Sequence, residues 1–147
     1  MITDAHIHVQ PWWELKPAVL EVMTRGRSDV DELQQIMKSP TQLLRRLDAD
    51  GIERAVLVNY PSPDLMGFTH GVNEYVARYC EAAPDRLVPM GGVHPRFADD
   101  AGAEVRRAAE MGVRAEVANI MEDIPHDRIR DLTVDEALQL NLVNERR

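Results

Sequence analysis

A short apolar run in the middle of the chain constrains the fold more than any other feature. The segment RAVLVNY at residues 54–60 is rich in β-branched side chains and is followed by Pro61, a pattern typical of a strand buried in a parallel sheet. A helical pattern precedes it, with Ser39 as cap, Pro40 in the first turn and Gly51 past the end. A buried strand between helical segments predicts a parallel α/β sheet.

The rest of the chain repeats this alternation. Further strands are predicted at residues 1–9, 86–95 and 113–120, and further helices at residues 28–40, 69–84, 99–112 and 133–147. Ser28 is the predicted N-cap of the first of these helices. The chain is therefore predicted to be a single α/β domain over residues 1–147, a partial TIM-like (β/α) barrel of about four parallel strands with outer helices. A complete barrel takes about 250 residues, and this chain has 147.

Charge and composition limit the partners and the compartment. The formal net charge is -8 at pH 7, and no basic stripe is present, so we expect neither nucleic acid nor an anionic membrane surface as a partner. No apolar run approaches the roughly 20 residues of a membrane helix. Cys80 is the single cysteine, which excludes an intrachain disulfide and fits a cytoplasmic protein. A small-molecule substrate is the expected partner.

The segment DAHIHVQPWW at residues 4–13 carries the clearest functional signal. Residues i and i+2 of a strand point the same way, so His6 and His8 are predicted to share one face with Asp4. Two imidazoles on one face can reach a common ion at about 2.0–2.1 Å, and Asp4 could help to orient them. The pair predicts a divalent metal site, although the spacing alone does not select zinc over manganese, iron or nickel. The alternative is a pair of structural histidines on a strand.

Three more residues are candidates for binding a substrate beside that metal. Functional groups of parallel α/β sheets gather at the carboxyl ends of the strands, and Asn59 and His94 lie at or near such ends. His94 is in addition the candidate catalytic or ligand residue, and the alternative for it is a loop histidine bonded to the backbone. Trp12 is predicted to form a wall of the pocket, with plain core packing as the alternative.

These motifs resemble a known family. DAHIHVQPWW is similar to the opening of the amidohydrolase superfamily, specifically its branch of amidohydrolase-related enzymes similar to aminocarboxymuconate-semialdehyde decarboxylase. The similarity continues through LDADGIERAVLVNYPSPDLMGFTHGVNEYVARYCEAAPDRLVPMGGVHPR and covers about residues 1–115. The resemblance implies a (β/α)₈ barrel, a divalent metal that is usually zinc, and hydrolysis or non-oxidative decarboxylation of small carboxylated or cyclic substrates. It also implies that His6 and His8 are the paired metal ligands of the first strand.

The chain departs from that family in its second half. The family's further ligands are a histidine after the fifth strand and an aspartate after the eighth, and its catalytic-site histidine follows the sixth strand. None of these has a match in this sequence. The resemblance therefore predicts a truncated amidohydrolase-type domain and leaves open whether this form of it is active.

Two other functions remain open. TatD-like metal-dependent nucleases also carry an aspartate followed by a His-x-His pair, although the acidic charge and the segments QPWW and MGFTH count against a nuclease. A four-stranded half-barrel would also expose unpaired strand edges. A second copy could cover them, which would make the chain a non-catalytic homodimer.

Overall fold

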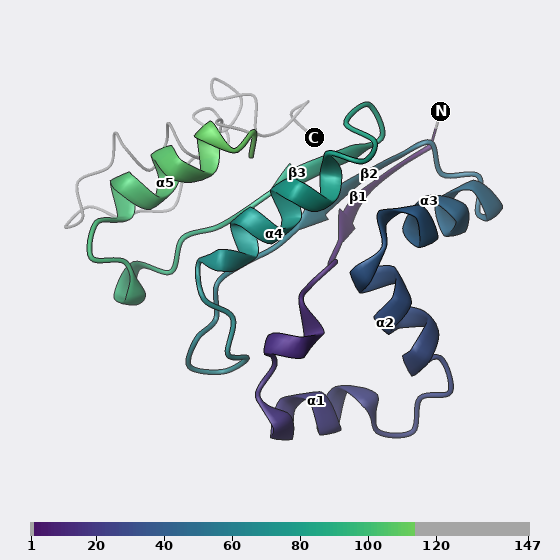
Figure 1. Cartoon of the computed structure of the whole chain (residues 1–147), viewed down its shortest axis with the longest axis horizontal. Helices are drawn as coiled ribbons and strands as arrows, with labels where there is room; N and C mark the ends of the chain where they lie inside the picture. Colours follow the sequence, from purple (N-terminus) through teal and green to yellow (C-terminus); the bar gives the residue numbers. More distant parts are fainter. Residues whose placement is uncertain (1, 114–147) are drawn as a thin grey trace, which may run out of the picture.

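The computed structural model describes residues 2–113, in which strands and helices alternate along the chain (Figure 1). The elements are β1 (Thr3–Ile7), η1 (Trp12–Glu14), α1 (Pro17–Thr24), α2 (Val30–Lys38), α3 (Pro40–Ala49), β2 (Arg54–Val58), α4 (Gly71–Cys80), β3 (Leu87–Met90), η2 (Pro95–Phe97) and α5 (Ala101–Glu110). The fourth strand and the last helix predicted from the sequence lie outside the described residues.

The three strands form one parallel sheet in the order β1-β2-β3. Thr3 pairs with Arg54 at the start of the first ladder, and Ala55 pairs with Leu87 at the start of the second. Helices α1, α2 and α3 carry the chain from β1 to β2, and α4 carries it from β2 to β3, as parallel neighbours require. The predicted α/β class with a parallel sheet and flanking helices is confirmed, and the arrangement matches part of a β/α barrel.

Helices cover one face of this sheet. Ala55, Leu57 and Leu87 are completely buried and share one core with apolar residues of the helices, namely Ile36, Met37, Leu43, Leu47, Val72 and Val76. Figure 1 shows α4 lying along β3. Val56 and Val58 are only partly buried, as expected for alternate residues that point to the opposite face of the sheet. The sheet therefore has a packed outer face and a more open inner face within the described part of the chain.

Local sequence signals predict the start of α3 correctly and the cap of α2 wrongly. Helix α3 begins at Pro40 directly after Ser39, as predicted, and Gly51 past its end has φ +71°. Helix α2 has Asp29 at its cap position, so the prediction of Ser28 as N-cap is wrong by one residue. The Asp29 carboxylate accepts two hydrogen bonds from the Arg27 guanidinium, and this ion pair fixes the turn that leads into the helix.

The sequence patterns do not predict η1 and α1. Helix α1 starts at Pro17, has no side-chain cap and buries none of its residues completely, although Val19, Leu20 and Met23 pack against the core. None of the helices within residues 2–113 has both the length and the apolar character needed to cross a membrane.

Candidate metal site at the carboxyl edge of the sheet

Strand β1 changes register between Asp4 and Ile7, around the first histidine of the pair. Asp4 lies opposite Ala55, and Ile7 lies opposite Leu57. Three steps along β1 therefore match two along β2, which is a β-bulge that re-aims the side chains after it. The Asp4 carboxylate accepts a hydrogen bond from the backbone N–H of His6 at 3.0 Å. The predicted strict alternation is thus interrupted, and Asp4 contacts the His6 backbone.

His6 lies within this bulge and His8 just after it, and their imidazoles converge. Their Nε2 atoms lie 3.0 Å apart, and the two rings meet edge to face. The Nδ1 atom of His8 lies 2.7 Å from the backbone carbonyl oxygen of Val58. A carbonyl oxygen can only accept, so His8 carries its proton on Nδ1 and directs the lone pair of Nε2 toward His6. The ring of Tyr60 packs against His8 with centroids 5.5 Å apart.

This geometry fits two ligands of one metal ion. Two imidazole nitrogens bound to zinc at about 2.0–2.1 Å with a tetrahedral angle lie about 3.3 Å apart, close to the 3.0 Å between the two Nε2 atoms. A ligand histidine commonly donates its other ring N–H to a carbonyl or carboxylate, as His8 does to Val58. Both side chains are exposed, so an ion can reach them. Within residues 2–113, no group of three or more His, Cys, Asp or Glu side chains could hold a metal.

Asn59 follows β2 and ties it to the segment after His8. Its Nδ2 donates a hydrogen bond of 2.7 Å to the backbone carbonyl of Val9. The residue is 1% exposed, and its Oδ1 atom is buried without a hydrogen-bond partner in the described structure. The substrate contact predicted for Asn59 stays a prediction.

His94 lies in the segment after β3, close to His70. The backbone N–H of His94 donates to Nε2 of His70 at 3.1 Å, and its ring packs against Phe97. The Nδ1 atom of His94 is buried and has no hydrogen-bond partner. Just before it, Gly92 is held by Asn73, which accepts from the Gly92 N–H at 3.1 Å and donates to its carbonyl at 2.9 Å. The chain after β3 is therefore fixed, and His94 keeps a free ring nitrogen.

Trp12 lies in the main core and is 8% exposed. It also lines a small cavity of about 90 Å³ together with Trp13, Leu20 and Met37. Trp13 is largely exposed and packs edge to face against Tyr75. The structure therefore shows the packing role that was the alternative for Trp12, and the pocket-wall role stays a prediction.

Sequence patterns miss one residue of this edge. Gln10 is 4% exposed, and its Nε2 atom is buried without a partner. In the described residues, unpartnered buried side-chain atoms thus follow each of the three strands, at Gln10, Asn59 and His94. The one other unpartnered buried side-chain atom in the described residues is Nε of Arg54, at the start of β2. Unsatisfied buried polar atoms are uncommon and often mark a missing ligand or water. Their position at one edge of the sheet could not be read from the sequence, because it depends on burial.

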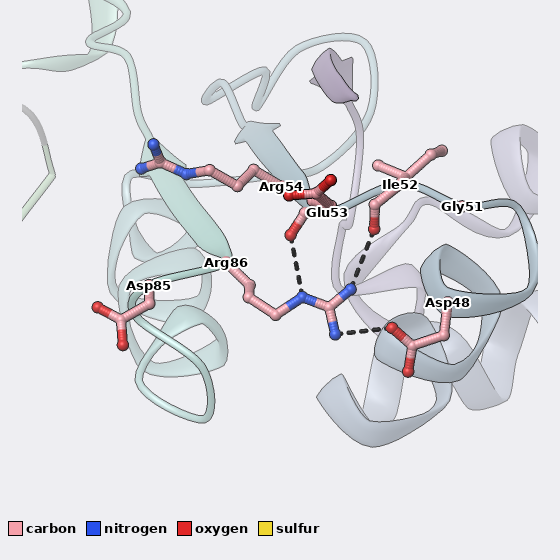
Figure 2. Close-up of a pocket in the computed structure, with 7 residues that line it drawn as sticks. All are labelled: Asp48, Gly51, Ile52, Glu53, Arg54, Asp85 and Arg86. Carbon is pink, nitrogen blue, oxygen red and sulfur yellow. Dashed lines mark hydrogen bonds and ion pairs between the residues drawn. The ribbon is translucent and has the colours of Figure 1, made fainter. Parts of the chain in front are cut away.

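The amino ends of the strands lie beside a cavity that an arginine side chain crosses (Figure 2). A cavity of about 530 Å³ opens beside the amino ends of β2 and β3. Figure 2 shows that the Arg86 side chain crosses it and reaches two backbone carbonyls and a carboxylate. Its guanidinium donates to the carbonyls of Ile52 and Glu53, each at 3.0 Å, and forms an ion pair with Asp48 at 2.7 Å. Arg86 therefore joins the start of β3 to the turn before β2.

Comparisons with known proteins add a fold-level likeness. No protein-family model and no curated protein matches the sequence. Among solved structures, the chain is similar to a probable 2-pyrone-4,6-dicarboxylic acid hydrolase from Acinetobacter baumannii, crystallised with citric acid bound, with a TM-score of 0.46 and 19% identity. The match covers 76% of this chain and 35% of that chain. A similarity of this extent assigns no function.

Proposed function

We propose that this chain carries the first strands of an amidohydrolase-type, metal-dependent hydrolase or non-oxidative decarboxylase acting on a small carboxylated or cyclic substrate. The observation that supports it best is the pair of Nε2 atoms, 3.0 Å apart at the carboxyl edge of a parallel sheet. His6 and His8 would hold a divalent ion, with zinc as the first candidate. Such an ion, when bound, would act as a Lewis acid toward a substrate carbonyl or a water.

The remaining residues of the edge would serve the substrate and the ligands. Asp4 fixes the backbone of His6, and the Val58 carbonyl fixes the imidazole of His8. Gln10 offers a free N–H donor and His94 a free ring nitrogen, which suits polar groups on a small substrate. Zinc takes four ligands, so the ion would need at least two more groups or waters beyond the histidine pair.

Metal analysis of the purified chain tests this proposal. We expect bound or titratable zinc in the wild type, and a loss of at least tenfold in zinc affinity in His6→Ala and His8→Ala, because each variant removes one of two convergent ligands. His70→Ala is the matched control, since it removes a histidine outside the pair. A folded wild type that binds no zinc, manganese, iron or nickel would reject the metal site.

A second candidate, a non-catalytic half-barrel that pairs with another copy, is supported by one observation. In residues 2–113, β1 and β3 are the two edge strands of the sheet, and such edges favour pairing with another chain. Sedimentation at several protein concentrations tests this. Dimers without metal-dependent turnover of any small carboxylated substrate would favour this candidate, and a stable monomer would count against it.

A further inference from the structure

The segment that carries His8 leaves the sheet before the histidine is reached. The ladder between β1 and β2 ends at the pair Ile7↔Leu57, so His8 and Val9 lie beyond the last strand pairing. A backbone segment without ladder bonds is held only by other contacts. The position of the His8 imidazole therefore depends on what fixes these two residues.

Two contacts from β2 and its end supply that support, together with the side chain of Val9, which is completely buried in the main core. The Val58 carbonyl holds the His8 imidazole at 2.7 Å. The next residue, Asn59, holds the Val9 carbonyl at 2.7 Å through its side-chain Nδ2. Residues 58 and 59 are thus joined to residues 8 and 9 by two successive hydrogen bonds. The Asn59 amide takes the place of a ladder hydrogen bond where the sheet pairing has ended.

The buried side chain of Asn59 makes one hydrogen bond that an apolar residue could not make. The side chain is 1% exposed, yet only its Nδ2 is bonded and its Oδ1 has no partner in the described structure. An unsatisfied buried acceptor is costly, and an apolar side chain of the same size would leave the Val9 carbonyl without its donor. The hydrogen bond from Asn59 restrains the Val9 carbonyl, and through it the backbone of the residue that follows His8.

We infer that Asn59 is a positioning residue for the histidine pair, acting through the Val9 carbonyl on the placement of His8. This inference rests on the proposed metal function. Mutating a residue that orients metal ligands commonly lowers metal affinity 10–100-fold. We expect removal of the Asn59 amide to lower zinc affinity within that range.

The test compares Asn59 with a matched buried asparagine. Asn73 is 2% exposed and bonds the Gly92 backbone through both amide atoms, but it does not touch residues 8 and 9. Zinc affinity is measured by competition with a chromophoric chelator for Asn59→Leu, Asn59→Ala and Asn73→Ala, at a temperature where circular dichroism shows each variant folded. We expect both Asn59 variants to bind zinc about 10–100-fold more weakly. Asn73→Ala should bind within about twofold of the wild type, although it loses two hydrogen bonds.

A metal-free readout separates this inference from the proposed function. In the apo protein, ¹⁵N-detected imidazole spectra should show His8 with its proton on Nδ1, and a mixture of the two tautomers in Asn59→Leu. If the wild type binds no metal but this tautomer shift occurs, the metal function fails and the positioning role stands. If zinc affinity and the His8 tautomer are both unchanged in the Asn59 variants, the inference is overturned. It is equally overturned if neither Asn59 variant folds, since Asn59 would then serve the fold itself.

Discussion

The Nδ1 atom of His8 and the carbonyl oxygen of Val58 lie 2.7 Å apart, and this contact makes the two histidines of the pair unequal. His8 presents a lone pair on Nε2, so His6 must donate its Nε2 proton across the 3.0 Å gap. We expect the apo protein at neutral imidazole to show the Nδ1–H tautomer at His8 and the Nε2–H tautomer at His6. Metal binding through both Nε2 atoms should then move the His6 proton to Nδ1 and leave His8 unchanged.

Two-dimensional ¹H–¹⁵N spectra of the imidazoles, recorded with and without zinc, check this expectation. His70 is an internal reference, because its Nε2 accepts from the His94 N–H and should stay unprotonated in both states. An Nε2–H tautomer at His8 in the apo protein would contradict the Val58 contact.

Replacing Arg86 should destabilise the fold without changing the metal site. Arg86→Met removes three donated interactions, to Ile52, Glu53 and Asp48, and leaves two carbonyls to be satisfied by water. We expect a loss of about 1–3 kcal/mol in the free energy of unfolding, measured with urea. Arg86→Lys should recover little of it, since a single ammonium cannot match the guanidinium fork.

Asp48→Asn separates the ion pair of Arg86 from its two hydrogen bonds to backbone carbonyls. The Asp48 carboxylate is largely exposed, and exposed ion pairs contribute about 0–1 kcal/mol, so this variant should stay close to the wild type. A loss in Asp48→Asn as large as in Arg86→Met would show that the ion pair, and not the two carbonyl bonds, stabilises this edge.

Gly67 should tolerate substitution less well than Gly51. Both have positive φ, at +101° for Gly67 and +71° for Gly51, but a Cβ on Gly67 would lie 2.8 Å from the Glu14 carbonyl oxygen, while Gly51 has open space. We expect Gly51→Ala to cost about 1–2 kcal/mol, the usual penalty for a left-handed backbone, and Gly67→Ala to cost clearly more. Urea midpoints of the two variants measure the difference, and equal midpoints would contradict the close approach.

Cys80 should make the fold sensitive to alkaline pH. Burial raises the pKa of its thiol from 9.0 to about 12, so between these values the unfolded chain loses this proton more readily than the folded chain. Stability should therefore fall as pH rises through about 9 and upward. Burial also raises the pKa of Tyr75 and Tyr79, so the comparison is made between wild type and Cys80→Ala. The slope of the urea midpoint against pH should be smaller in the variant, and identical slopes would contradict the thiol's role.

Features with local causes could be predicted from the sequence. The apolar run of β2, the proline at the start of α3 and the glycine at its end act within a few residues, and the structure has each of them as expected. The His-x-His spacing indicated the candidate pair, but β1 ends at Ile7, so the pleat of the strand does not place His8. These signals sufficed for the α/β class and for the approximate place of the candidate site.

Features that depend on a partner far along the chain could not be predicted. The bulge in β1 is defined by its pairing with β2. The hydrogen bond from the His6 backbone to Asp4 at this bulge could therefore not be predicted from the local sequence. The bond from Asn59 to Val9 joins residues 50 positions apart, so a side chain that reads as a polar strand end is an anchor in the structure. Trp12 could not be assigned to core or pocket, because aromatic residues serve both.

The separation of 50 residues between His8 and Val58 imposes an order of events on the growing chain. The two histidines are synthesised before β2, and their rings cannot be held in place until β2 has been made and has docked against β1. Parallel pairing over such a distance forms slowly, because a long loop must close first. An ion that arrives earlier would meet an unfolded segment with two free imidazoles, so selective capture belongs to the folded sheet and not to the isolated β1 segment.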